Sequence, residues 1–146
     1  FEGKKRVVLF PPDQSDLLYR LPFNVHSTVD IDKPDYKEYP ALKYAKGLTG
    51  ILEYGDTLFM PSGYWHHIEY LEGGYGLSVR SLPTQFSVKL KGFYNLTIQR
   101  KLDDMLRVTF GNKWFELKKS IAKKRAERAI KRMHKNIAHS GDLAFQ

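Results

Sequence analysis

Residues 55–68 constrain the fold of this chain more than any other stretch. They run from a Gly-Asp turn through a short apolar segment and a proline–glycine corner into a segment that carries His66 and His67. Neighbouring residues on a strand point to opposite faces of a sheet. One histidine can therefore face the interior of a β-barrel, where an imidazole can bind iron, while the other faces outward.

The first part of the chain has the pattern of short antiparallel strands joined by turns. Glu72-Gly73-Gly74 is predicted to form a hairpin turn, because glycine tolerates positive φ. The connection over residues 21–40 is long for a compact domain, and it either borders a substrate groove or serves as a structural cover. Runs bounded by proline, glycine or aspartate predict strands at residues 4–10, 47–53, 57–60, 64–71 and 75–82.

After Pro83 the apolar residues recur at helical spacing. One helix is expected to end at Gly111, and Asn112 can cap the next. We therefore predict a mainly β portion followed by C-terminal helices. The last helix has an apolar stripe and a basic face, which comprises Lys118, Lys119, Lys123, Lys124, Arg125, Arg128, Lys131, Arg132 and Lys135.

The composition excludes several classes of protein. The chain has no cysteine, which rules out disulfides and thiolate metal sites and agrees with a reducing, cytoplasmic compartment. No apolar run approaches the ~20 residues of a membrane helix, and no signal-peptide pattern opens the chain. Because a strand pattern follows almost directly after Phe1, we expect further sequence to precede it. The net charge of +8 permits an acidic partner without requiring one.

Three parts of the chain carry a resemblance to a known family. They are KRVVLFPPDQ at residues 5–14, VDIDKPDY at 29–36, and GDTLFMP with YWHHIE between residues 55 and 69. Together, and in this order, they resemble the JmjC-type cupin-like hydroxylases, and among them the factor-inhibiting-HIF-like group. The resemblance implies that the chain is the C-terminal half of such a protein.

The resemblance implies a domain organisation. Residues 1–82 would form the C-terminal part of a double-stranded β-helix, the barrel of the cupin or jelly-roll class. Residues 83–138 would form a helical extension through which the protein makes a homodimer, and residues 139–146 a flexible tail.

The resemblance also implies that the protein uses Fe(II) and the cosubstrate 2-oxoglutarate. By position, His66 looks like the distal ligand of a metal centre that also needs a His-x-Asp/Glu pair. Lys5 looks like the lysine that pairs with the far carboxylate of 2-oxoglutarate. Tyr64, Trp65 and Ser78 are candidates for lining the pocket.

The rest of the metal site is not evident in this sequence. The family's His-x-Asp/Glu pair is expected upstream of Lys5, before the chain begins. The only His-x-acid triplet here is His67-Ile68-Glu69, whose polar residues share the strand face opposite to His66. We interpret it as a surface pair.

Arg80 is a competing candidate for binding 2-oxoglutarate. It stands where similar family members have asparagine, and related oxygenases outside the JmjC group use an arginine on the last strand for this purpose. Arg80, Ser78 and His66 have the same sequence parity, so all three face the barrel if the Gly73-Gly74 turn preserves the register. Arg80 can equally pair with an acid in the barrel mouth. The flanking sequence favours Lys5.

The sequence is compatible with three functions of the whole protein. The first is an Fe(II)- and 2-oxoglutarate-dependent oxygenase that hydroxylates a protein side chain or a small molecule. The second is a non-catalytic cupin-like scaffold that dimerises through its helices. The third is a phosphate- or nucleic-acid-binding protein that uses the basic helix, residues 113–137. The same helix could lie on an anionic membrane, but it lacks the bulky aromatic face of a membrane-surface helix. A dimerising helix is favoured over both kinds of anionic partner.

Overall fold

The protein is described by a computed structural model that covers residues 2–81 and 84–143. The chain divides into two compact units. The first takes residues up to 15 together with residues 45–81, and the second takes residues 16–44 together with the chain after residue 81. The long connection predicted from the sequence therefore belongs with the helices.

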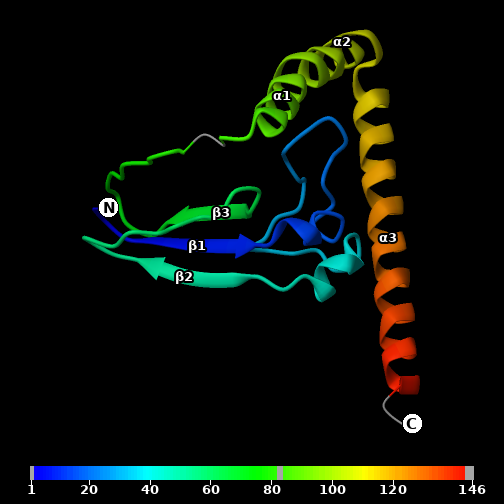
Figure 1. The fold of residues 1–146 in the computed structure, drawn as a ribbon, viewed down its shortest axis with the longest axis horizontal. Coiled ribbons are helices and arrows are strands. Elements are labelled where there is room, and N and C mark those ends of the chain that lie inside the picture. The colour runs from blue at the N-terminus through cyan, green and yellow to red at the C-terminus, as the bar shows by residue number, and fades with distance from the viewer. Residues whose placement is uncertain (1, 82–83, 144–146) are drawn as a thin grey trace. The chain divides into compact units, whose positions relative to one another are not determined.

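The first unit is built on an antiparallel sheet with the order β2-β1-β3 (Figure 1). Val7, Val8 and Leu9 lie in the central strand and are all buried. A strand buried on both faces reads as a continuous apolar run rather than an alternating one. Pro11 and Pro12 follow β1, and proline cannot donate to a ladder. The strands are β1 (Lys5–Phe10), β2 (Leu48–Leu52) and β3 (Trp65–Tyr70), and a 3-10 turn, η1 (Pro12–Gln14), follows β1.

Two of the predicted strands are absent from the described structure. Residues 57–60 and 75–81 pair with no strand in the described part of the chain. Their apolar side chains are largely exposed, with Phe59 at 83%, Leu77 at 91% and Val79 at 88%. A strand needs a neighbour for its backbone N–H and C=O groups, and the apolar pattern of a segment does not supply one.

The predicted hairpin at Gly73-Gly74 is also wrong. Instead of turning back along β3, the chain passes beside Glu2, whose backbone N–H donates to the carbonyl oxygen of Tyr75 at 2.8 Å. A Cβ atom on Gly74 would collide with the carbonyl oxygen of Glu2. The glycine therefore allows a close approach of two backbone segments rather than a tight turn.

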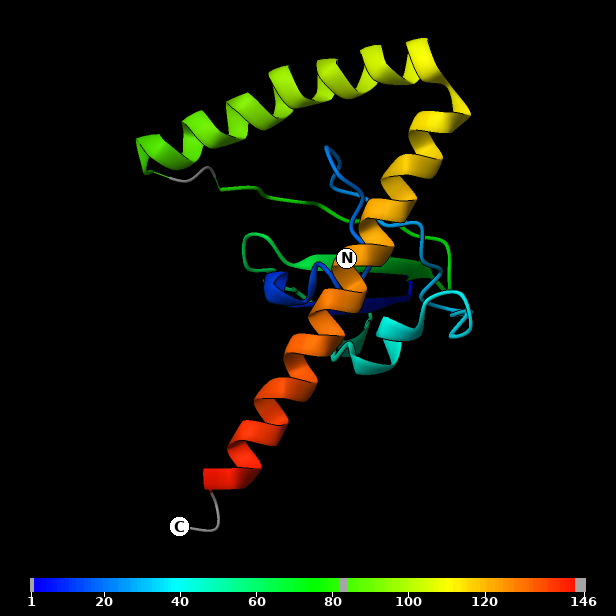
Figure 2. The ribbon, with the colours of Figure 1, turned by 90° about the vertical axis from the view of Figure 1, so that its right-hand side faces the viewer.

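The second unit contains the helices (Figure 2). The prediction that a helix ends at Gly111 is confirmed: this residue has φ +54°, and its N–H donates to the carbonyl oxygen of Arg107 at 2.8 Å. The next helix begins at Asn112, as expected, and the capping role of its side chain stays a prediction. The elements are α1 (Phe86–Tyr94), a π-helical turn η3 (Asn95–Gln99), α2 (Arg100–Phe110) and α3 (Asn112–Leu143).

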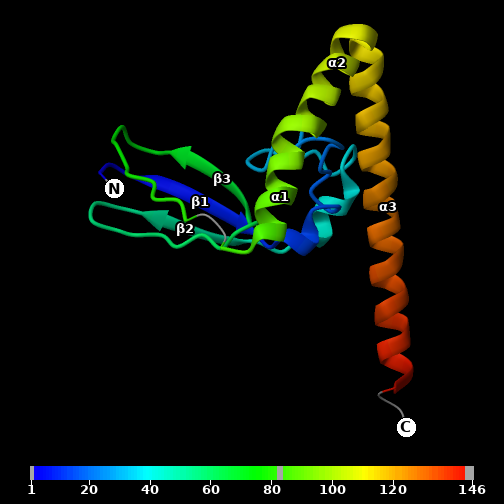
Figure 3. The ribbon, with the colours of Figure 1, turned by 45° about the horizontal axis from the view of Figure 1, so that its top comes forward.

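Parts of residues 16–44 pack against α3. A short 3-10 helix, η2 (Pro40–Tyr44), lies beside α3 (Figure 3). The Tyr44 ring is 5.5 Å from the His134 ring, and the Phe23 ring is 5.9 Å from the Trp114 ring. The buried apolar residues of this unit are Leu17, Leu18, Tyr19, Leu21, Ala41, Leu42, Ala122 and Ala126.

Lys118 departs from the predicted basic face of the last helix. Its residue is only 4% exposed, and its Nζ donates to Asp103 Oδ1 at 2.7 Å and to Oδ2 at 2.9 Å. A buried charge needs a partner of opposite sign, and α2 supplies that carboxylate next to α3. Lys118 is therefore part of the packing between α2 and α3, and its prediction as a solvated residue is wrong.

Two predictions concern residues that lie partly or wholly outside the described ranges. The predicted domain boundary at Leu82 and Pro83 lies outside the described residues, as do residues 144–146 of the predicted tail. α3 continues to Leu143. None of the helices in the described ranges is long and apolar enough to cross a membrane.

Candidate functional site

The pairing of β1 with β3 determines which side chains share a face of the sheet. Leu9 lies opposite His66, and Lys5 lies opposite Tyr70. Directly opposite residues of an antiparallel pair point to the same side. Lys5 and His66 therefore share one face, which we call the site face. Its residues on these two strands are Lys5, Val7, Leu9, His66, Ile68 and Tyr70.

The register also sets the spacing between the two candidate residues. Lys5 is paired with Tyr70, which is four positions from His66 along β3. At about 3.4 Å per residue, their backbone positions are about 14 Å apart. Side chains on a strand stand roughly perpendicular to the sheet, so this spacing leaves room for a small dicarboxylate between the lysine and the imidazole. Lys5 is partly buried, whereas His66 is exposed.

The ammonium of Lys5 also contacts an aromatic residue of the site face. Its Nζ is 5.9 Å from the centroid of the Tyr70 ring, on the strand opposite. This distance is at the outer limit of a cation–π contact, which contributes about 0.5–1 kcal/mol at an exposed site. The contact orients the lysine weakly.

The opposite face of the sheet has a different chemistry. His67 lies opposite Val8, and Glu69 lies opposite Arg6. Arg6 Nε donates to Glu69 Oε2 at 2.9 Å. The two adjacent histidines thus lie on opposite faces, as strand alternation predicts, and the His67-x-Glu69 pair is separated from His66 by the sheet.

Trp65 and Tyr64 have contacts of a structural kind. Trp65 lies on the face opposite to His66, and its Nε1–H donates to Ser15 Oγ at 2.9 Å. The N–H of Tyr64 donates to the carbonyl oxygen of Pro61 at 3.3 Å, which closes the turn before β3. The structure therefore places the indole of Trp65 away from the site face.

Arg80 and Ser78 lie in the exposed segment of residues 75–81. Because this segment is outside the described ladders, the register that would relate both residues to His66 is not formed there. The competition between Arg80 and Lys5 for the cosubstrate stays a prediction.

The donor set on the described residues fits part of an iron centre. Within residues 2–81 and 84–143, no three His, Cys, Asp or Glu side chains gather in a way that could hold a metal ion. An imidazole is a suitable ligand for non-haem iron, and an ammonium is a suitable partner for a carboxylate. This chain can therefore offer one metal ligand, His66, and one cosubstrate anchor, Lys5.

Comparison with known proteins identifies the family. Residues 1–99 match the model of the cupin-like domain. The chain belongs to the cupin-like family. This match and the antiparallel sheet followed by C-terminal helices confirm the predicted family and fold class. The dimer and the roles of Lys5, His66 and Arg80 stay predictions.

This cupin-like chain is also similar to several curated proteins. It is 35% identical to the zebrafish (Danio rerio) HSPB1-associated protein 1 homolog over 112 residues, which are 73% of this chain and 21% of that protein. It is 41% identical to the zebrafish tRNA wybutosine-synthesizing protein 5 over 85 residues, or 57% of this chain and 26% of that protein. For the human protein of the same name the identity is 38%, over 57% of this chain and 27% of that protein. The chain thus spans 21–27% of the length of these relatives.

Proposed function

We propose that this cupin-like chain is part of an Fe(II)- and 2-oxoglutarate-dependent oxygenase. In this proposal His66 is the distal metal ligand, and Lys5 binds the far carboxylate of 2-oxoglutarate. The observation that carries the proposal is the placement of both residues on one face of adjacent strands, four register positions apart. A bound iron ion would supply the activation of oxygen for hydroxylation.

The neighbours of the two residues support these roles. Val7 and Leu9 are buried on the same face, Val7 between the positions of Lys5 and His66 and Leu9 directly opposite His66. Apolar side chains at this place exclude water and lower the local dielectric constant, which strengthens the attraction between an ammonium and a carboxylate. The sheet thus binds and orients the cosubstrate, while its other face carries the Arg6–Glu69 ion pair.

The names of the relatives point to two substrate classes. One name refers to the synthesis of wybutosine in tRNA, and the other refers to an association with the protein HSPB1. For the present chain we propose hydroxylation of a protein side chain or a small molecule, with an RNA nucleoside as a further candidate suggested by the first name.

Anaerobic titration of the intact protein with Fe(II) and 2-oxoglutarate tests the assignment of His66. His66→Ala should lower the affinity for the metal by at least about 10–100-fold, because the loss of even an outer-shell partner has an effect of this size. His67→Ala is the matched control and should bind the metal normally, since His67 lies on the other face. Equal metal affinity in the wild type and His66→Ala would refute the assignment.

A non-catalytic scaffold is the second candidate, and exposed apolar residues on the helices favour a partner there. Phe86 is 78% exposed, Phe93 64%, Met105 58% and Val108 85%. We propose that a second copy of the chain covers these residues in a homodimer. Analytical ultracentrifugation of the intact protein should show dissociation after Phe93→Ser and Val108→Ser. The scaffold model further expects no 2-oxoglutarate turnover with any substrate, whereas the oxygenase model requires turnover.

A further inference from the structure

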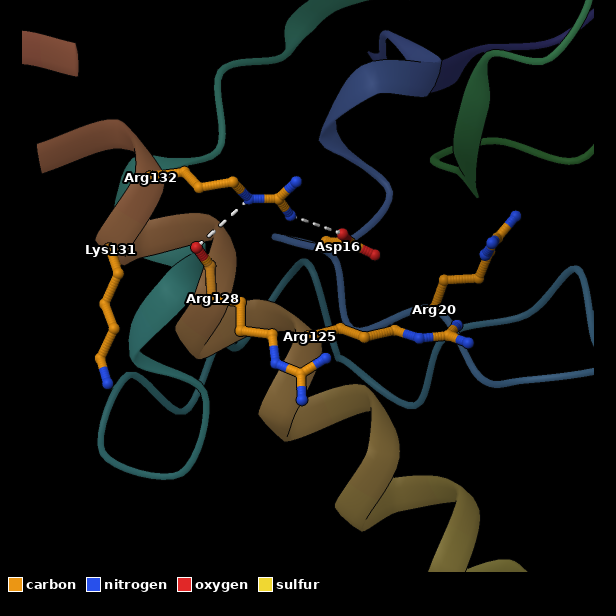
Figure 4. A pocket seen from close by; sticks show the side chains of 6 residues that line it. All are labelled: Asp16, Arg20, Arg125, Arg128, Lys131 and Arg132. Carbon is orange, nitrogen blue, oxygen red and sulfur yellow. Dashed lines mark hydrogen bonds and ion pairs between the residues drawn. The ribbon is translucent and has the colours of Figure 1, made fainter. Parts of the chain in front are cut away.

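A groove with strongly basic walls lies in the helical unit. It has a volume of about 670 Å³ and runs between α3 and the chain near residues 16–20 (Figure 4). Because five cationic side chains and one carboxylate line it, its net charge is about +4. The residues of this basic groove are Asp16, Arg20, Arg125, Arg128, Lys131 and Arg132.

Most of these cations lack an acidic partner. Arg132 extends from α3 to Asp16, with Nη2 at 3.4 Å from Oδ2, and its Nε donates to the backbone oxygen of Arg128 at 3.4 Å (Figure 4). In the part of the chain that the structure describes, no carboxylate forms an ion pair with Arg20, Arg125, Arg128 or Lys131. The positive charge of the groove is therefore largely uncompensated.

The adjoining surface of α3 is different, which argues against a uniformly solvated basic face. Lys119 Nζ is 2.8 Å from Glu116 Oε1, and Lys123 Nζ is 3.3 Å from Glu38 Oε1. Glu127 lines the same surface. Three acids and three lysines line that surface, so its charges balance, whereas the basic groove keeps a net positive charge.

We propose that the basic groove binds consecutive phosphates of a nucleic-acid backbone. Four of the five cations are arginines, whose planar guanidinium matches phosphate oxygens in two-point contacts. A single phosphate monoester carries a charge of only about −1.5 to −2, which is too little to neutralise the groove. Several phosphates in a row are therefore the fitting ligand.

The spacing along α3 suits such a ligand. The seven steps along the helix from Arg125 to Arg132 correspond to about 10.5 Å, at about 1.5 Å per residue. One strand of a duplex advances about 3.4 Å per phosphate along its axis, so the groove covers about three nucleotides. No aromatic residue is among the lining side chains, which leaves no platform for base stacking. Binding should therefore be independent of base sequence.

Fluorescence anisotropy with a labelled duplex DNA of random sequence tests the proposal on the intact protein. Between about 50 and about 200 mM salt, the logarithm of the binding constant should fall with the logarithm of salt concentration, with a slope near −2.7 for about three phosphate contacts. The double variant Arg125→Gln/Arg128→Gln should bind more weakly and reduce this slope by about two.

The matched control is Lys119→Gln/Lys124→Gln, which removes the same charge from the neighbouring mixed-charge surface. It should leave the slope unchanged. If both double variants lost the same DNA affinity, the DNA would be attracted by the net charge of the protein alone. This result would overturn the assignment to the basic groove. Vesicles containing phosphatidylserine and free inorganic polyphosphate are the competing ligands. Preferential binding to either one, lost in the groove variant, would refute a nucleic-acid ligand. Thermal melts of all variants should coincide, so that unfolding is not mistaken for lost contacts.

Discussion

Lys118 and Asp103 form a nearly buried ion pair that joins α3 to α2. Both carboxylate oxygens accept from the Lys118 ammonium, and Asp103 Oδ1 also accepts from the indole N–H of Trp114 at 2.8 Å. The two helices meet at Gly111, so one carboxylate binds two donors from the first turns of α3. The bend between α2 and α3 thus rests on a buried polar contact.

Replacing Asp103 with alanine should lower the free energy of unfolding of the intact protein by about 3–5 kcal/mol. The reason is that Lys118 would remain buried without a compensating charge. Urea denaturation followed by circular dichroism measures the change. The double variant Asp103→Leu/Lys118→Met should regain most of the loss, because it leaves no uncompensated ion. If the double variant is as unstable as Asp103→Ala, the burial of Lys118 is not the cause.

Gly111→Ala should destabilise the protein by about 1–3 kcal/mol, because side-chain-bearing residues adopt its backbone conformation, φ +54° and ψ −129°, only under strain. Gly92→Ala is the matched control: this glycine lies inside α1, and an added Cβ would meet no atom within 4 Å. In a helix interior this change should stabilise the protein by about 0.5–1 kcal/mol. Thermal melts of both variants check the opposite signs, and a melting temperature of Gly111→Ala at or above that of the wild type would contradict the account.

Tyr19 should make the stability of the protein depend on pH in the alkaline range. The residue is 3% exposed, and burial raises the pKa of its phenol above the ordinary value of 10.0, against an opposing effect of the hydrogen bond from the Ala41 N–H at 3.0 Å. A raised pKa in the folded state means that the folded protein favours the neutral phenol. The stability that the neutral Tyr19 phenol contributes is therefore complete below about pH 10. This stability is lost as the pH rises through the folded-state pKa.

The variant Tyr19→Phe isolates this effect. At neutral pH it should cost about 1–3 kcal/mol, because the buried N–H of Ala41 loses its acceptor. The difference in unfolding free energy between wild type and variant should shrink as the pH rises above about 10. Tyr54→Phe changes a tyrosine that is 82% exposed and serves as the control, with a difference that stays small throughout. A constant difference for Tyr19→Phe across the alkaline range would argue against the buried phenol.

Lys5 and Arg80 can be separated by their effect on 2-oxoglutarate. If Lys5 binds the far carboxylate, Lys5→Gln should raise the dissociation constant by about 10–150-fold, which corresponds to the 1.5–3 kcal/mol of a hydrogen bond to a charged group. Arg80→Gln should change it by less than about threefold. Isothermal titration of the intact protein under anaerobic conditions measures both constants. The reverse order of effects would assign the cosubstrate to Arg80.

Local chemistry explains which parts of the fold were predictable from sequence. The runs that became β1 and β2 are rich in apolar residues and lie next to proline or glycine, and the end of α2 is marked by a glycine. Residues 57–60 and 75–81 have a similar apolar character, yet they form no ladder, because pairing depends on a neighbouring strand rather than on the segment itself. Lys118 fits the spacing of a solvated helix face. It is buried nevertheless, because its ammonium pairs with Asp103, fifteen residues earlier.

The candidate site was predictable to a similar extent. Alternation along one strand was enough to separate His66 from His67. The common face of Lys5 and His66 was not evident, because it depends on the register between strands that are far apart in the sequence. Arg20 was missed as a member of the basic groove. The available signal was an arginine inside the apolar run of residues 17–21, which an entirely buried segment would not tolerate.

The pairing of β1 with β3 has a consequence for the size of the ligand that the site face can accept. A slip of one residue would turn Lys5 and His66 to opposite sides of the sheet, and a slip of two would change their separation by about 7 Å. The distance between ammonium and imidazole can therefore not be adjusted gradually by sliding the strands. Under the proposed function, the strand register selects the length of the diacid that fits between Lys5 and His66. A diacid one carbon shorter or longer than 2-oxoglutarate would have to be accommodated by changes of side-chain rotamer alone.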